Sequence, residues 1–135
     1  MTNKEFMNRA YEISKRLKAR RQRIEYLNAQ VGTANQSLSG MPNGSPSSTS
    51  QMEELTVRIL DLELAIEQDE KALTSARAEI SAAINSLNNE NLSTILQMRY
   101  LDYMRWEDIM ASLDYCRSYL YELHGRALRM IRQKT

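Results

Sequence analysis

The stretch that decides the fold runs from residue 52 to residue 87 and reads MEELTVRILDLELAIEQDEKALTSARAEISAAINSL. Its apolar residues recur at alternating steps of three and four over about five heptads, with one interruption at Asp69. They are Met52, Leu55, Ile59, Leu62, Ile66, Leu73, Ala76, Ile80, Ala83 and Leu87. Such a repeat is typical of a long helix that packs against another helix along one seam. We therefore predict a helix over residues 52–88.

A second seam precedes it. The same alternation of threes and fours runs from Phe6 to Val31, with one polar interruption at Arg20. Its members are Phe6, Ala10, Ile13, Leu17, Ile24, Leu27 and Val31. No Gly or Pro occurs before Gly32, which is a natural helix stop. The pattern predicts a helix over residues 3–31.

The two periodic stretches are separated by residues 32–51, GTANQSLSGMPNGSPSSTSQ. Gly, Ser, Thr, Asn and Pro dominate this segment, and no periodicity continues through it. That composition predicts a flexible linker. Two matching seams joined by such a linker bury their apolar faces most simply against each other. Residues 1–90 are therefore expected to form a long antiparallel coiled-coil helical hairpin.

The charge distribution supports this pairing. Residues 1–31 carry a net charge of +5, residues 52–90 carry −6, and residues 91–135 carry +2. If Val31 lies beside Met52, then Arg23, Arg20 and Arg16 come opposite Leu60/Asp61, Glu63 and Glu67. The basic run KRLKARRQR at 15–23 is thus interpreted as neutralised within the chain, with a nucleic-acid-binding arm as the alternative. The acidic residues at 63, 67 and 70 are interpreted as a salt-bridged face rather than a metal site, because no Glu-x-x-His partner exists.

Shorter periods follow from residue 91 to residue 135 and predict three short helices. The first uses Leu92, Ile95, Leu96, Met98 and Leu101, the second Trp106, Ile109, Met110 and Leu113, and the third Leu120, Leu123, Ala127, Leu128 and Ile131. A short turn at Asp114-Tyr115 separates the last two, which is the spacing of a helix-turn-helix. Cys116 stands where a capping Ser or Thr is expected and should cap poorly. The predicted fold class is all-α: the hairpin, then a small three-helix helix-turn-helix domain at 91–135.

These residues carry a resemblance. The run LQMRYLDYMRWEDIMASLDYCRSYLYELHGRALRMI resembles the fourth conserved region of primary-type bacterial sigma factors, with its W-x-x-I helix and its ALR ending. Together with Met41-Pro42-Asn43-Gly44-Ser45-Pro46 in the linker, the whole chain is similar to phage transcription activators of the RinA and ArpU type. The resemblance implies a sequence-specific DNA-binding regulator of late genes that acts at a promoter with or near RNA polymerase.

The resemblance also implies which residues meet DNA. The base-facing positions fall on Arg117, Ser118, Tyr121 and Glu122. An arginine suits the N7 and O6 acceptors of guanine, and a glutamate accepts from the cytosine amino group. Tyr119 is expected to be exposed beside Tyr121, and further along the helix Arg126, Arg129 and Arg132 are expected to meet phosphates or solvent. The Tyr-Glu pair departs from the sigma pattern, so sequence preference does not transfer.

Other classes of function find little support. We expect no enzyme, no catalytic residue, no metal and no cofactor, because Cys116 and His124 are the only residues of their types and no Gly-rich phosphate loop occurs. His124 is interpreted as a surface or phosphate-side residue. Arg99 and Glu107 are predicted either as a salt bridge between the first two short helices or as an ordinary solvated pair. No apolar run has membrane-spanning or signal-peptide length, which predicts a cytoplasmic protein without a membrane partner.

Partners follow from the size of the predicted module. One such module covers about half of a usual binding site, so a second copy or another protein must supply the rest. We expect double-stranded DNA as a partner, together with either a homo-oligomer formed through the long helices or a complex with host RNA polymerase. The helix at 52–88 outruns the one at 3–31, and this excess seam favours the homo-oligomer. The alternative function is a coiled-coil scaffold or adaptor, for phage assembly or for sigma sequestration, whose terminal module binds only protein.

Overall fold

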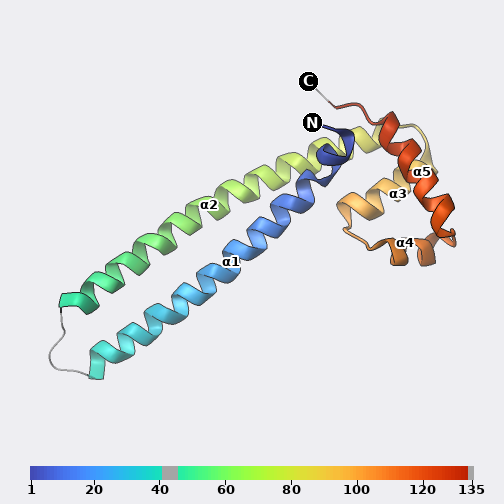
Figure 1. Cartoon of the computed structure of the whole chain (residues 1–135). Coiled ribbons are helices and arrows are strands. Elements are labelled where there is room, and N and C mark those ends of the chain that lie inside the picture. Colours follow the sequence, from blue (N-terminus) through green and yellow to red (C-terminus); the bar gives the residue numbers. More distant parts are fainter. Residues whose placement is uncertain (41–45, 134–135) are drawn as a thin grey trace. The chain divides into compact units, whose positions relative to one another are not determined.

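The computed structural model describes residues 1–40 and 46–133, with side chains at 1–33 and 50–133. Every regular element in these ranges is helical, which confirms the predicted all-α class. The two long helices are α1, Asn3–Gly40, and α2, Pro46–Asn85 (Figure 1). The shorter elements are α3, Glu90–Leu96, the π-helical turn η1, Gln97–Leu101, α4, Trp106–Leu113, and α5, Arg117–Met130. Among the described helices none has the length and apolar character needed to cross a membrane.

The chain forms two compact units. Unit 1 consists of Met1–Ser14 together with Ala72–Thr135, and unit 2 consists of Lys15–Lys71. These bounds differ from the predicted domains 1–90 and 91–135. Both unit boundaries fall inside the long helices, because α1 and α2 each contribute residues to both units.

The apolar seams of the long helices lie where the periodicity places them. Every residue of both predicted seams is buried or half-buried, and Leu17 and Leu27 are among the most buried residues of unit 2. Met7 and Ile84 lie outside the predicted seams but are fully buried in unit 1. They belong to the same core cluster as residues of α3, α4 and α5. In unit 1 the long helices therefore bury a wider face than a two-helix seam requires.

The predicted bounds of the long helices are wrong at the linker. Gly32 does not end α1, which continues to Gly40, and α2 begins at Pro46 rather than at residue 52. A glycine inside a helix costs only about 1 kcal/mol relative to alanine, so Gly32 alone does not stop the helix. Proline is compatible with the first helical position because its missing N–H has no partner there in any case. Of the predicted linker at 32–51, residues 41–45 lie outside the described residues.

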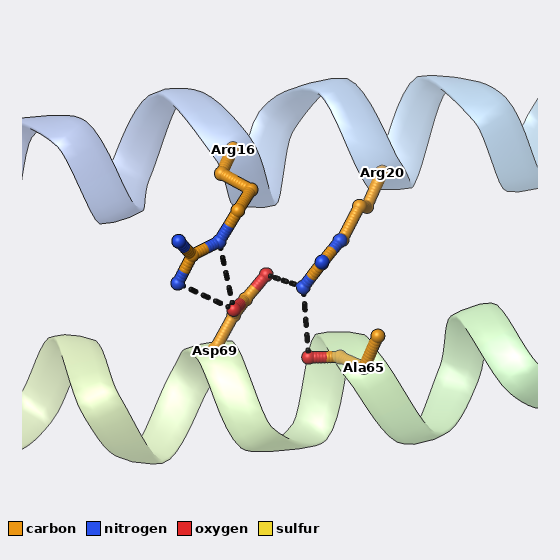
Figure 2. Close-up of polar contacts among 4 residues, drawn as sticks. All are labelled: Arg16, Arg20, Ala65 and Asp69. Carbon is orange, nitrogen blue, oxygen red and sulfur yellow. Dashed lines mark hydrogen bonds and ion pairs between the residues drawn. The ribbon is translucent and has the colours of Figure 1, made fainter.

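Unit 2 contains a buried carboxylate in its seam. Asp69 of α2 is 4% exposed and receives two hydrogen bonds at Oδ1 from Arg16 of α1, at 3.1 and 2.9 Å, and one at Oδ2 from Arg20, at 2.6 Å (Figure 2). Arg20 also donates to the carbonyl oxygen of Ala65, at 3.5 Å. Burial raises the pKa of Asp69, but the hydrogen bonds and charges of the two arginines outweigh it and leave the pKa below its ordinary value.

The expected neutralisation of the basic run is thus present, in a different register. Arg16 and Arg20 pair with Asp69, and Arg21 pairs with Glu70 at 2.7 Å. The prediction had placed Glu67 and Glu63 opposite Arg16 and Arg20. It was anchored on Val31 beside Met52, and both helices in fact extend beyond those positions.

Unit 1 is built around one core to which α1, α2, α3, α4 and α5 all contribute. Its fully buried members include Met7, Ile80, Leu92, Ile109 and Leu120. Arg9 of α1 forms an ion pair with Glu79 of α2 on the surface of this unit. Because residues from both ends of the chain share this core, the first helix is needed to complete the carboxy-terminal module.

Candidate nucleic-acid interface

α4 and α5 are joined by a tight turn that fixes their relative direction. Asp114 ends α4 in the left-handed conformation, with φ 57° and ψ 43°, which a short acidic side chain tolerates better than most. Cys116 precedes α5 and makes no side-chain capping hydrogen bond, as expected for a thiol at this position. Ile109 of α4 and Leu120 of α5 are both completely buried. Two buried anchors and a three-residue turn thus hold α5 against α4.

The opposite side of α5 is the outer face. We use this name for Arg117, Ser118, Tyr119, Tyr121, Glu122, Arg126 and Arg129, all of which are exposed. They are the residues predicted to bind DNA, and the structure brings them together on one helix. The buried residues Leu120, Leu123 and Ala127 occupy the other side. With 3.6 residues per turn, positions 118, 122 and 129 point directly away from that buried stripe.

The charged groups of the outer face are only weakly paired with each other. Glu122 and Arg126 form an ion pair at 3.5 Å between positions i and i+4, and both side chains are exposed. Such a surface pair contributes less than about 1 kcal/mol, so either partner can exchange it for a ligand. Arg117 and Arg129 add two more positive charges to the same face. The outer face is therefore cationic overall.

The two tyrosines of the outer face are held by neighbouring rings. Tyr121 packs edge-on against Trp106 of α4 with 5.3 Å between ring centroids, and Tyr119 packs edge-on against Tyr115 at 5.0 Å. Both tyrosines keep more than two fifths of their surface exposed, which confirms the predicted exposed pair. Rings fixed in this way lose little further conformational freedom when a ligand binds.

Behind the outer face lies a cluster of Trp106, Arg99 and His124, in which Trp106 packs on the core as its apolar position predicts. Trp106 is half-buried and packs on the core, and the Arg99 guanidinium lies 4.5 Å from the centroid of its ring. Arg99 also donates to the carbonyl oxygen of Met104, at 2.9 Å. Of the two alternatives for Arg99 and Glu107, the salt bridge does not form among the described residues. Arg99 instead ties η1 to the start of α4.

His124 belongs to the same cluster, so its predicted place on the surface is wrong. Its Nε2 atom lies 2.6 Å from the hydroxyl oxygen of Tyr100, and its ring packs edge-on against Trp106 at 4.7 Å. Burial lowers the pKa of His124 to about 4, helped by the nearby charges of Lys4 and Arg99. Burial raises the pKa of Tyr100 to about 12. Both groups are neutral near pH 7, so the hydrogen bond between them joins two uncharged partners.

The carboxy-terminal end of α5 is capped by the other end of the chain. The Asn3 side-chain amide donates to the carbonyl oxygens of Leu128, at 2.7 Å, and Ile131, at 3.0 Å. Gln133 in turn donates to the Asn3 side-chain oxygen and to the Met1 carbonyl oxygen. The last carbonyls of a helix lack partners inside it, and Asn3 satisfies one of them here. No feature of the sequence points to this contact, because the residues are more than 120 positions apart.

A second unpredicted support holds the loop before α4. Tyr103 has a left-handed backbone with φ 57°, which is uncommon for a bulky side chain. Its hydroxyl accepts a hydrogen bond from Arg77 of α2 at 2.9 Å and lies 3.1 Å from the Ser14 hydroxyl of α1. Arg77 also donates to the carbonyl oxygen of Leu101, at 3.0 Å. Both long helices thus position the loop that leads into α4.

Comparisons with known proteins identify a family. A family model described as a protein of unknown function, DUF1492, matches residues 43–132, which include α2 to α5. No curated protein and no solved structure matches the chain. Because the match covers more than half of the sequence, this chain belongs to the DUF1492 family.

Proposed function

We propose that this protein is a sequence-specific DNA-binding transcription regulator in which α4 and α5 act as a helix-turn-helix. The observation that carries the proposal is the outer face of α5, where seven exposed residues that include three arginines lie on a helix anchored on its other side by buried leucines. A helix of this kind fits the major groove, which is about 12 Å wide. A duplex carries a negative phosphate at every nucleotide along its backbone. The positive charge of the outer face therefore suits nucleic acid better than an acidic helix surface, where negative charges are fewer.

The chemistry of the face suggests a division of roles. Arg117, at the start of α5, can donate two hydrogen bonds to a guanine, and Glu122 can accept one from a cytosine amino group. Arg126 and Arg129 lie further along and suit phosphates, whose contacts set position rather than sequence preference. Ser118, Tyr119 and Tyr121 complete the contact surface.

The cellular setting remains part of the proposal. By its resemblance to late-gene activators, the protein acts in the cytoplasm of a phage-infected bacterium, at a promoter with or near RNA polymerase, and without catalysis of its own. The rival function is a scaffold or adaptor whose carboxy-terminal module binds only protein. The exposed apolar side chains Val57, Leu60 and Leu64 of α2 favour a protein partner in either case.

The dependence of DNA binding on salt tests the proposal. Binding of the full chain to a labelled mixed-sequence duplex should weaken steeply with salt, and Arg129→Ala should reduce the slope of log K against log salt by about 1. Arg58→Ala is the matched control, because it removes an arginine from an exposed position of α2 in unit 2, outside the basic run at 15–23. It should leave the slope unchanged.

Two results would contradict the proposal. Absence of duplex binding by the wild-type chain at about 50 mM salt would favour the adaptor, since even nonspecific binding is strong at low salt. Equal slopes for Arg129→Ala and Arg58→Ala would show that Arg129 does not contact the phosphates. Thermal melts of both variants establish that the fold is intact.

A further inference from the structure

α2 carries a second apolar surface in unit 2. Val57, Leu60 and Leu64 are 56%, 53% and 60% exposed, respectively. Single exposed apolar residues are common on protein surfaces, but these three are spaced by three and four positions and so share one side of the helix. A contiguous apolar stripe of this kind usually marks an interaction site.

This stripe faces away from α1. The seam of α2 in the same stretch consists of Leu55, Ile59, Leu62 and Ile66, which are all half-buried. At 100° per residue, positions 57, 60 and 64 lie on the side of the helix opposite that seam. Pairing with α1 therefore uses one face of α2 and leaves the other without a cover among the described residues of unit 2.

The exposed stripe belongs to a heptad pattern of its own. Steps of four and three continue from it in both directions along α2. The full series is Glu53, Val57, Leu60, Leu64, Glu67 and Lys71. When the series is paired with its own reverse, Glu53 comes opposite Lys71 and Leu60 opposite Leu64, which are complementary pairs. Val57 comes opposite Glu67, which is not. In an antiparallel pair of such helices, leucine meets leucine at the centre and Glu53 of each copy meets Lys71 of the other. The charges at the ends of the stripe thus match a second copy that runs in the opposite direction.

We propose that two copies of this chain associate in antiparallel fashion through the exposed stripes of their α2 helices. A two-fold axis that passes between Leu60 and Leu64 relates the two copies. Closed two-fold dimers are the commonest homo-oligomers, and their interfaces use the same patch on both copies. The contact is small, which predicts a dissociation constant of the order of 10 µM. α1 and α2 have nearly equal lengths of 38 and 40 residues, so the second long helix does not outrun the first as predicted, and no excess seam is left to form an oligomer.

The dimer deepens the proposed function by supplying a second α5. Dimeric helix-turn-helix proteins bind two half-sites related by the same symmetry as the protein. The association itself needs no DNA. It can therefore fail while DNA binding stands, and the reverse also holds, so the two proposals are tested separately.

Sedimentation velocity of the full chain without DNA tests the interface. At about 100 µM the wild type should be mainly dimeric, and Leu60→Glu should be monomeric because four buried leucines become two leucines beside two carboxylates. The matched control is Tyr26→Glu, since Tyr26 is 55% exposed on α1 and lies outside the stripe. The control should remain dimeric. A monomeric wild type at 200 µM, or equal behaviour of the two variants, would overturn the proposal.

A charge exchange tests the antiparallel register. Glu53→Lys and Lys71→Glu should each weaken the dimer about fivefold, because each places like charges opposite one another at both ends of the stripe. The double variant restores opposite charges and should recover wild-type association. If the double variant loses as much free energy of association as the two single variants together, the register is wrong and the proposal fails. Circular dichroism of every variant checks that helicity is unchanged.

Discussion

At the scale of single residues, the contact between His124 and Tyr100 shows how α5 is held in place. The imidazole shares a hydrogen bond with the tyrosine hydroxyl and also packs against Trp106, so α5, η1 and α4 meet at one histidine. The sequence indicates where His124 lies along α5 but not which residues surround it. Its ring sits at the edge of the buried stripe, and its partners come from two other elements. That is why a surface position was expected and a half-buried one was found.

The depressed pKa of His124 predicts acid sensitivity. An unfolded histidine binds its proton near pH 6.5 and the folded one only near pH 4, so protonation favours the unfolded state. The contribution of His124 to the free energy of unfolding should be fully present above about pH 6.5 and should be lost as the pH drops towards 4. The full shift corresponds to about 3 kcal/mol, and because water screens part of the ring we expect about half of that.

Urea denaturation at several pH values measures this effect. His124→Gln removes the titrating group, so the difference in unfolding free energy between wild type and variant should shrink between pH 7 and pH 4. Acidic side chains titrate in both proteins and cancel in the difference. A difference that stays constant over this range would show that the folded state does not suppress protonation of His124.

At the scale of elements, the polar interruptions of the two seams turn out to be partners. Arg20 and Asp69 each break an otherwise apolar heptad repeat, and their side chains meet at 2.6 Å. The existence of both helices and the identity of their buried faces follow from periodicity. The register between them does not, because it depends on where the helices end, and neither Gly32 nor Pro46 acts as the composition of the segment suggests.

Replacement of Asp69 should be costly in isolation and tolerated in combination. Asp69→Ala leaves Arg16 and Arg20 without their carboxylate, and because both guanidinium groups still reach water we expect a loss of about 2 kcal/mol. Arg20→Leu combined with Asp69→Leu makes the seam continuous and should recover that stability. Urea denaturation measures both. A loss for Asp69→Ala no larger than that for the exposed Asp61→Ala would contradict a role for the buried pair.

At the scale of the whole molecule, the amino-terminal residues and the carboxy-terminal module belong to one compact unit. Met1–Ser14 belongs to the same compact unit as Ala72–Thr135, and Asn3 caps the end of α5. The sequence does not reveal this, since the heptad pattern passes through residues 14 and 72 without a change. The three short helices, the turn at Asp114 and the exposure of the outer face of α5 were all predictable, because local periodicity determines them. Contacts between distant ends of the chain carry no such local signal.

Selection from random duplexes tests the central claim, that the outer face of α5 recognises DNA sequence. The wild-type chain should enrich a defined motif, and Arg117→Ala should lose preference at one base position, by about 1 to 3 kcal/mol, while the other positions keep theirs. Enrichment of no motif by the wild type, or an identical motif at every position with Arg117→Ala, would contradict the account.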